Sequence, residues 1–154
     1  MSNDYRIPKE RLPVVLTTIG GERIVGELFV QPSVRNRDGR EEAPDLLNAS
    51  EPFFPMRDER GETFLVAKDR VREMEVGPDQ HASETWRIGS PATIEVLLAG
   101  GDVRTGVIYL ESLAGRSRVI DFLNRVAERF LTLHTANGEL LINRSAVERV
   151  RSVD

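Results

Sequence analysis

Side chains that could perform metal chemistry are few and far apart in this chain of 154 residues. The two histidines, His81 and His134, stand 53 positions apart, and the chain contains no cysteine. Zinc sites usually show Cys or His ligands at short, recognisable spacings. A zinc site here would need both histidines and several carboxylates to be brought together by folding alone. We therefore predict no metal site and no cofactor.

Motifs for nucleophilic or phosphate chemistry are also missing from the sequence. No G-x-S-x-G segment is present, which would place a serine nucleophile on a sharp turn. Neither phosphate-binding glycine pattern, G-x-x-x-x-G-K-[ST] or G-x-G-x-x-G, follows a predicted strand. Asp45 and Asp121 are interpreted as helix-start caps, and Glu22 and Asp102 as solvated carboxylates beside turns. The sequence therefore predicts a non-enzymatic protein with no catalytic residues.

The two aspartates belong to a segment that occurs twice, as "DLLNASEPFF" (45–54) and as "DFLNRVAERF" (121–130). Upstream, "VVLTTIGGERIVGELFV" (14–30) aligns with "IEVLLAGGDVRTGVIYL" (94–110). The identical pairs are mostly glycines, turn formers and apolar residues, which fix backbone geometry: Gly20/Gly100, Gly21/Gly101, Gly26/Gly106, Asp45/Asp121, Leu47/Leu123, Asn48/Asn124, Phe54/Phe130, Leu65/Leu141 and Val71/Val147. Self-similarity of this kind indicates repeated architecture, so we predict an internal repeat.

Each copy has the local pattern of β structure. Alternating apolar residues flank the Gly-Gly pairs, which is typical of a hairpin. Gly26 and Gly106 stand inside the strands that follow, where glycine marks a bend or a close backbone approach. A second hairpin is predicted in each copy, with tips at Arg60-Gly61 and Asn137-Gly138, before a short final strand. The predicted fold is mainly β, with two tandem small bent-sheet or barrel units and one short helical turn in each.

The second copy of the repeated segment, viewed alone, predicts a longer helix, because apolar residues recur at helical spacing from Val119 to Leu133. Pro52 and Pro55 would break such a helix in the first copy. If the copies share a fold, the common solution is one capped helical turn followed by a strand. Pro44 suits the start of this turn, and Asn48 and Asn124 suit its end. We expect Phe54 and Phe130 to begin or join the next strand and to face the core.

The predicted boundaries are an N-terminal tail (1–12), a first unit (13–76), a linker (77–91) and a second unit (92–154). The linker is rich in Gly, Pro, Ser and polar residues, and contains the only tryptophan, Trp86. The expected role of Trp86 is to dock the linker onto a barrel or into the seam between the units, and the alternative is to stack against a ligand. No signal peptide and no apolar run of about 18 to 20 residues is present, so we predict a cytoplasmic protein without membrane partners.

The repeated unit resembles the Sm-like (LSm/Hfq) small β-barrel superfamily. In the first copy the matching residues are Gly21 with Gly26, Asp45 with Asn48, and Lys68 before Val71. In the second copy they are Gly101 with Gly106, Asp121 with Asn124, and Arg144 before Val147. The resemblance implies a bent small-barrel topology over most of the chain.

Two departures affect the loops that hold RNA in that superfamily. The spacing from Asp to Asn is one residue shorter than the family has, and Asp69 and Ser145 replace the glycine that follows the basic residue. The resemblance therefore implies topology more strongly than RNA binding.

The sequence favours an interaction or scaffold protein that recruits a protein partner, or associates with itself, through open strand edges. The alternative is an Sm-like RNA-binding protein. A net charge of −4 disfavours that alternative, because phosphate contacts supply much of the affinity for nucleic acid. The predicted ligand or RNA contacts are Asn48, Lys68, Asn124, Arg144, Arg35, Arg37, Arg116 and Arg118.

Overall fold

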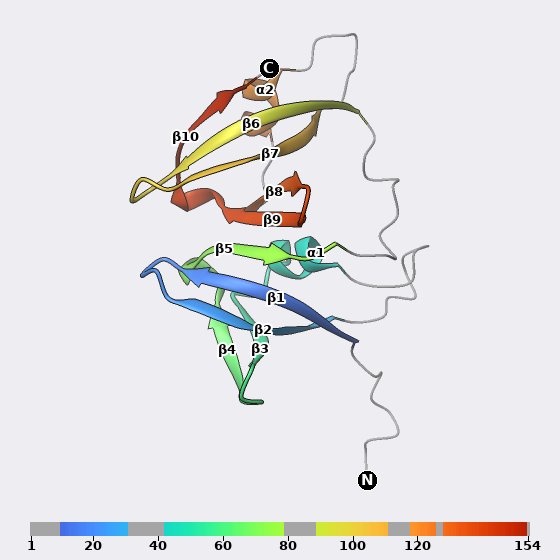
Figure 1. Ribbon diagram of the computed structural model, residues 1–154, viewed down its shortest axis with the longest axis vertical. Helices are drawn as coiled ribbons and strands as arrows, with labels where there is room; N and C mark the ends of the chain where they lie inside the picture. The colour runs from blue at the N-terminus through green and yellow to red at the C-terminus, as the bar shows by residue number, and fades with distance from the viewer. Residues whose placement is uncertain (1–9, 31–41, 79–88, 111–117, 126–127, 154) are drawn as a thin grey trace. The chain divides into compact units, whose positions relative to one another are not determined.

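The computed structural model describes residues 10–30, 42–78, 89–110, 118–125 and 128–153. The described chain is mainly β, as the sequence predicts, and its strands pair in antiparallel ladders (Figure 1). It divides into two compact units, Met1–Val76 and Gly77–Asp154. None of the helices in the described ranges is long and apolar enough to cross a bilayer. Trp86 and His81 of the predicted linker lie outside the described residues.

The described residues of the first unit form a five-stranded sheet with the strand order β5-β1-β2-β3-β4. Among these residues, one α-helix lies between β2 and β3, and one turn of 3-10 helix precedes β5. The first strand begins at Glu10, before the predicted start of the unit at residue 13. The elements are β1 (Glu10–Thr18), β2 (Arg23–Val30), α1 (Ala43–Asn48), β3 (Phe53–Asp58), β4 (Thr63–Ala67), η2 (Lys68–Arg70) and β5 (Val71–Val76).

The second unit has its elements in the same order along the chain, and its strand order is β10-β6-β7-β8-β9. Its first strand begins at Ser90, inside the predicted linker. The elements are β6 (Ser90–Leu98), β7 (Val103–Leu110), α2 (Val119–Arg125), β8 (Phe130–Thr135), β9 (Gly138–Asn143), η4 (Arg144–Ala146) and β10 (Val147–Ser152).

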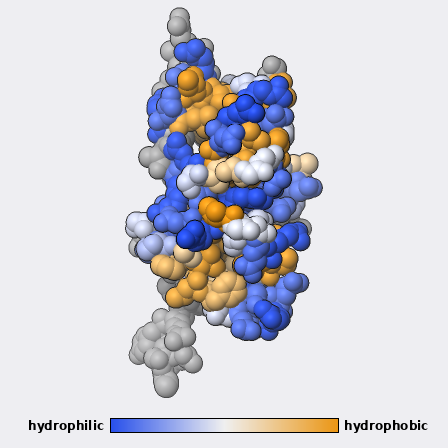
Figure 2. Space-filling view, turned by 90° about the vertical axis from the view of Figure 1, so that its left-hand side faces the viewer, coloured by the Kyte–Doolittle hydropathy of each residue, from blue (hydrophilic) through white to orange (hydrophobic). Residues whose placement is uncertain are grey.

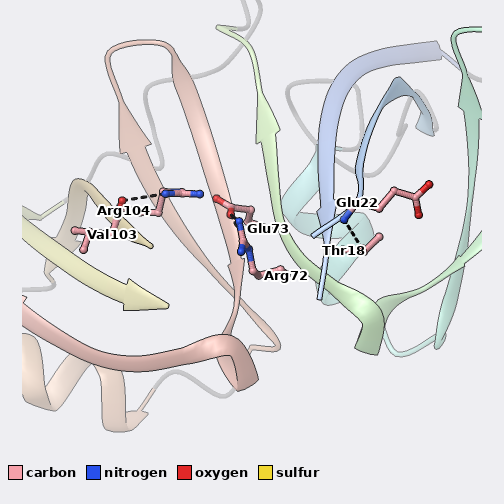
Figure 3. A network of polar contacts seen from close by, with 6 residues as sticks. All are labelled: Thr18, Glu22, Arg72, Glu73, Val103 and Arg104. Atoms are coloured by element: carbon pink, nitrogen blue, oxygen red, sulfur yellow. Dashed lines mark hydrogen bonds and ion pairs between the residues drawn. The ribbon is translucent and has the colours of Figure 1, made fainter. Parts of the chain in front are cut away.

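The Gly-Gly segments form the predicted hairpin turns. In the first unit, the Gly21 amide donates to Thr18 O at 2.9 Å, and Thr18 N donates to Glu22 O at 2.8 Å. Gly21 has a φ of 92°, a left-handed conformation that strongly favours glycine. Thr18 Oγ1 also accepts from Glu22 N at 3.1 Å, as Figure 3 shows, while the carboxylate of Glu22 points away from this bond. The acidic side chain at this turn therefore takes no part in closing it.

The tips of the second hairpins differ in length. In the first unit, Asp58 N donates to Glu62 O across a turn that contains the predicted tip Arg60-Gly61. In the second unit, the ladder continues to the pair Thr135–Gly138. The turn is therefore made by the two residues before Gly138, one position earlier than the predicted tip Asn137-Gly138.

Gly26 and Gly106 confirm the predicted close approach inside a strand. A Cβ atom at Gly26 would lie 2.1 Å from Arg57 O of β3. A Cβ atom at Gly106 would lie 2.8 Å from the Cβ atom of Leu133 on β8. These glycines let one strand pair closely on both sides where the sheet bends, and the β3–β4 hairpin is strongly turned relative to β1 in Figure 1.

The repeated segment forms one short helix and then a strand in each unit, which rejects the longer helix from Val119 to Leu133. Asp45 Oδ2 accepts a hydrogen bond from Glu42 N at 3.0 Å, so the predicted cap at the start of α1 is confirmed. The helix ends at Asn48, and the next residue, Ala49, has an extended conformation with a φ of −66° rather than a left-handed one. In the second unit α2 continues one residue beyond Asn124.

The two phenylalanines of the repeated segment are buried but are not structural equivalents. Phe130 pairs with Asn143, which directly precedes η4, whereas the residue that pairs with Ala67 directly before η2 is Phe53. Phe54 therefore corresponds to Leu131, a member of the core of the second unit. The offset between the units grows by one before this strand, because the segment from the start of the helix to the strand is one residue longer in the second unit. The longer turn of the β3–β4 hairpin then restores the original offset.

Each helix adds one apolar face to the core of its unit. In α1 the buried side chains are Ala43 and Leu47, which stand four positions apart on one helix face. In α2 the side chains packed against the core are Val119, Phe122 and Leu123. The short helices therefore depend on tertiary packing, because isolated helices of this length are marginal in water.

Candidate interaction surface

The most distinctive surface of the described chain is the free edge of β4, which ends the strand order of the first unit. Its inner edge pairs with β3, and the register aligns Pro55 with Leu65. Proline has no N–H, so this pair cannot exchange the two hydrogen bonds of a hydrogen-bonded pair. The hydrogen-bonded pairs are therefore Phe54–Val66 and Met56–Phe64.

This alternation sets the direction of the main-chain groups on the outer side of β4. Two bonds at the ends of the strand agree with it, since Lys68 N donates to Pro52 O at 2.8 Å and Asp58 N donates to Glu62 O at 2.9 Å. Even-numbered residues of this segment thus face β3. The N–H and C=O groups of Thr63, Leu65 and Ala67 face outward, where no strand of the described residues lies beside them.

Apolar side chains cover the solvent-facing side of the same hairpin. Leu65 is 70% exposed and Phe53 is 54% exposed, and both side chains lie on the sheet face opposite Phe54 and Met56, which are buried. Apolar residues reach the surface in several patches on the face shown in Figure 2. Large apolar side chains that stay in water do not gain the favourable free energy of burial. A pair of them on one hairpin therefore indicates an interaction site.

The edge of β4 differs from the edge at the end of the second unit. The strand β10 ends the order there and has charged, exposed side chains at Glu148, Arg149 and Arg151. Charged side chains are a common protection of an edge strand against pairing with another chain. The sequence of β4, TFLVA, contains no charged residue, so this edge lacks that protection.

A shallow open depression of about 410 Å³ lies on the same unit. Two surface ion pairs involve its lining residues: Arg11 Nη1 lies 4.0 Å from Glu27 Oε1, and Asp58 Oδ2 lies 3.6 Å from Nη2 of the neighbouring Arg60. It offers no histidine, lysine or hydroxyl group for catalysis. The lining residues are Arg11, Val25, Gly26, Glu27, Arg57, Asp58, Glu59 and Gly61.

Two of the predicted ligand contacts lie in the interior of the first unit or at its margin. Lys68 is only 1% exposed, and its Nζ donates to Ala49 O at 2.9 Å. A cation at this position stabilises the C-terminal end of α1, where carbonyl groups lack helical partners. Asn48 is half-buried at the end of the same helix. The contact of Lys68 is structural, and ligand binding at these two residues stays a prediction.

The corresponding basic residue of the second unit makes a similar bond from an exposed position. Arg144 Nη2 donates to Leu123 O in α2 at 2.9 Å. Asn124 is exposed on α2, and Arg118 precedes that helix with its Nε 3.7 Å from Asp121 Oδ2. Arg35, Arg37 and Arg116 lie outside the described residues. The structure thus brings Arg144 to α2 and leaves the proposed arginine loops untested.

An RNA site made by the loop arginines leads to a salt-dependence prediction. Four phosphate contacts on a single strand predict an affinity about 50-fold lower at 200 mM than at 50 mM salt. Lys68→Met should leave this binding unchanged, because Nζ of Lys68 is bonded to Ala49 O. Filter binding at the two salt concentrations measures both effects. Absence of binding at the lower concentration, where phosphate attraction is stronger, contradicts the RNA hypothesis.

His134 pairs with a carboxylate and an aromatic ring. Its Nδ1 lies 3.7 Å from Glu139 Oε2 on the adjacent strand, and its ring packs edge-on against Tyr109 at a centroid distance of 5.3 Å. Within the described ranges, no group of three or more His, Asp or Glu side chains is arranged to hold a metal ion. The arrangement is that of a cross-strand pair, which stabilises a sheet.

Residue-type motifs did not identify Phe53 and Leu65 as surface residues. The repeat instead predicts Phe54 and Leu65 as apolar positions that fix backbone geometry. A signal was present in the uncharged strand "TFLVA" and in Pro55, which lies opposite Leu65 and sets the phase of the ladder. These residues indicate an exposed apolar edge only once the strand is known to lie at the edge of the sheet.

Comparison with known proteins gives no match to a family model, to a curated protein or to a solved structure.

Proposed function

We propose that this protein is a non-enzymatic interaction or scaffold protein, built from a duplicated β unit of the Sm-like kind, which takes up a strand of another polypeptide at the edge of β4. The observation that supports the binding role is the unprotected edge: outward main-chain groups at Thr63, Leu65 and Ala67 beside the exposed side chains of Leu65 and Phe53. An added strand would satisfy the main-chain groups and cover the apolar side chains at the same time.

Matching backbone hydrogen bonds support the duplication. Thr18 N to Glu22 O in the first unit corresponds to Leu98 N to Asp102 O in the second. The bonds from Ile19 N to Arg70 O and from Ala99 N to Ala146 O also correspond, as do those from Lys68 N to Pro52 O and from Arg144 N to Arg129 O. A register shift occurs between Thr17 and Thr18 where β1 pairs with β5. A corresponding shift occurs between Val147 and Arg149 where β10 pairs with β6. Common irregularities of this kind are stronger support than shared strands, because bulges are specific features of a fold.

The edge leads to a capture prediction. Leu65→Lys places a charge on the edge without disturbing the core, since Leu65 is 70% exposed. We expect polypeptides retained by the immobilised wild-type chain from an extract of its source cell to be retained about tenfold less by Leu65→Lys. Quantitative mass spectrometry of the retained proteins measures the difference.

Ile120→Lys is the matched control, because Ile120 is an exposed apolar residue, 59% accessible, that lies on α2 rather than on an edge. It should retain the same proteins as the wild type. Equal retention by Leu65→Lys and the wild type would place binding elsewhere and would contradict the proposed function.

A further inference from the structure

We propose that the strand which occupies the edge of β4 is β4 of a second copy of this chain, antiparallel and centred on Leu65. The inference rests on the proposed function, because it names the partner of the same edge. The resulting dimer would be isologous, with the same surface of both copies in contact across a two-fold axis.

The outward groups of β4 are self-complementary about Leu65. Thr63 and Ala67 stand two positions before and after Leu65, and all three direct their N–H and C=O groups outward. Antiparallel pairing about a two-fold axis at Leu65 places each Leu65 opposite the other, and each Thr63 opposite Ala67 of the second copy. All outward main-chain groups of the strand then form hydrogen-bonded pairs.

A register centred one residue earlier is poorer. With the axis at Phe64, Thr63 pairs with Leu65 of the second copy, but Ala67 stands opposite Gly61. Gly61 lies in the hairpin turn with a φ of 87° and cannot continue the ladder as a strand residue. The side chains also favour the register centred on Leu65. It brings the exposed Leu65 side chains of the two copies together, on the sheet face that also carries the two exposed Phe53 rings.

The charges around the edge favour an antiparallel β4 of the second copy over a parallel β4 and over β10. The strand itself is uncharged; the exposed Glu62 directly precedes it, and the buried Lys68 directly follows it. Antiparallel pairing separates the two Glu62 side chains, because each stands opposite position 68 of the second copy, where the Lys68 side chain is buried. A parallel pair would align Glu62 with Glu62. Pairing with β10 of the second copy would place the charged side chains of that strand beside Leu65.

The small size of the contact predicts a weak dimer. Five residues of strand and two apolar side chains on each copy bury less than the ~1,600 Å² of a standard interface. The dimer fraction should therefore rise with protein concentration in light scattering after size exclusion. Leu65→Lys should raise the dissociation constant at least about tenfold, because two like charges would meet at the axis, and Ile120→Lys should not change it.

Single cysteines test the register directly, because the chain has no cysteine of its own. Residues of a hydrogen-bonded antiparallel pair lie about 5.5 Å apart between Cα atoms, within disulfide range. Leu65→Cys should therefore form a disulfide-linked dimer under mild oxidation. Thr63→Cys alone should not, since its two copies would be about 13 Å apart. A mixture of Thr63→Cys and Ala67→Cys should give the mixed dimer, and Ile120→Cys measures random cross-linking.

The inference is overturned if Leu65→Cys cross-links no faster than Ile120→Cys. Association that continues to long polymers would also overturn it, because head-to-tail pairing does not close. A monomer whose outward amides, those of Thr63, Leu65 and Ala67, are protected from hydrogen exchange would show that another part of the same chain covers the edge. If the chain is monomeric while Leu65→Lys still reduces capture of another protein, this inference fails and the proposed function stands. If neither self-association nor capture depends on Leu65, both fail.

Discussion

Gly26→Ala should destabilise the first unit by about 3 kcal/mol. The added Cβ would meet Arg57 O at 2.1 Å, Met56 Cε at 3.0 Å and Arg57 C at 3.1 Å. Two of these atoms belong to the backbone of β3, which cannot rotate away as the end of a side chain could. Relief would require β2 and β3 to separate at the bend, where Gly26 pairs with both Val14 and Asp58. The loss is measured by urea unfolding, with hydrogen exchange of β2 and β3 to assign it to this unit.

Substitutions at two other glycines give losses of stability with which the loss at Gly26 can be compared. At Gly21 a Cβ atom would meet nothing within 4 Å, so Gly21→Ala carries only the cost of a left-handed φ, about 1 kcal/mol. At Gly106 the closest contact is 2.8 Å, to the Cβ atom of Leu133, and the nearest backbone atom, His134 O, is 3.2 Å away. Because these contacts are longer than at Gly26, we expect an intermediate loss of about 2 kcal/mol in the second unit. Equal losses at Gly26 and Gly21 would show that backbone freedom, rather than strand contact, is what position 26 requires.

The same glycines show what the sequence can predict about this fold. Gly20-Gly21 and Gly26 specify backbone geometry through local chemistry, and the turn and the close approach are both where the pattern predicts them. Pro52 and Pro55 exclude the long helix because a proline inside a helix lacks a donor and clashes with the preceding turn. Local rules of this kind apply to both copies, so a proline in one copy also limits the helix that the other can form.

The candidate site was less predictable because it depends on strand order. The sequence shows that Leu65 is apolar and lies between two other apolar residues, Phe64 and Val66, which equally fits a core position or an exposed one. Which alternative holds depends on whether another strand lies beside β4, and strand order is a long-range property. The mismatch between Phe54 and Phe130 has a related cause: the segment from the start of the helix to the strand is one residue longer in the second unit, and a shift of one position along a strand exchanges the two faces of the sheet.

Lys68 shows that residue type alone does not separate a ligand contact from a structural one. A lysine near a loop fits phosphate binding, yet the side chain is 1% exposed and bonds the carbonyl of Ala49. Arg144 makes the corresponding bond to Leu123 O from an exposed position. The shared feature is a basic group at the C-terminal end of a short helix, where it complements the helix dipole.

Lys68→Ala should therefore lower the free energy of unfolding by about 3 kcal/mol. The variant loses a charge-assisted hydrogen bond and the burial of several methylene groups, and it leaves Ala49 O without this partner. Loss of the buried charge offsets part of this cost. Lys68→Met keeps most of the apolar volume and should lose only about 1 kcal/mol. Urea unfolding gives both values, and faster amide exchange at Leu46 would show that α1 loosens.

Arg144→Ala separates the buried position from the helix-end bond itself. Because Arg144 is exposed, water can hydrate Leu123 O after the substitution, and we expect a loss below about 1 kcal/mol. The order of losses should then be Lys68→Ala, Lys68→Met and Arg144→Ala, with the last two close together. A Lys68→Met variant more stable than the wild type would mean that desolvation of the ammonium outweighs its bond to Ala49 O. In that case Lys68 would not stabilise the fold, and the result would favour a ligand-binding role for this residue.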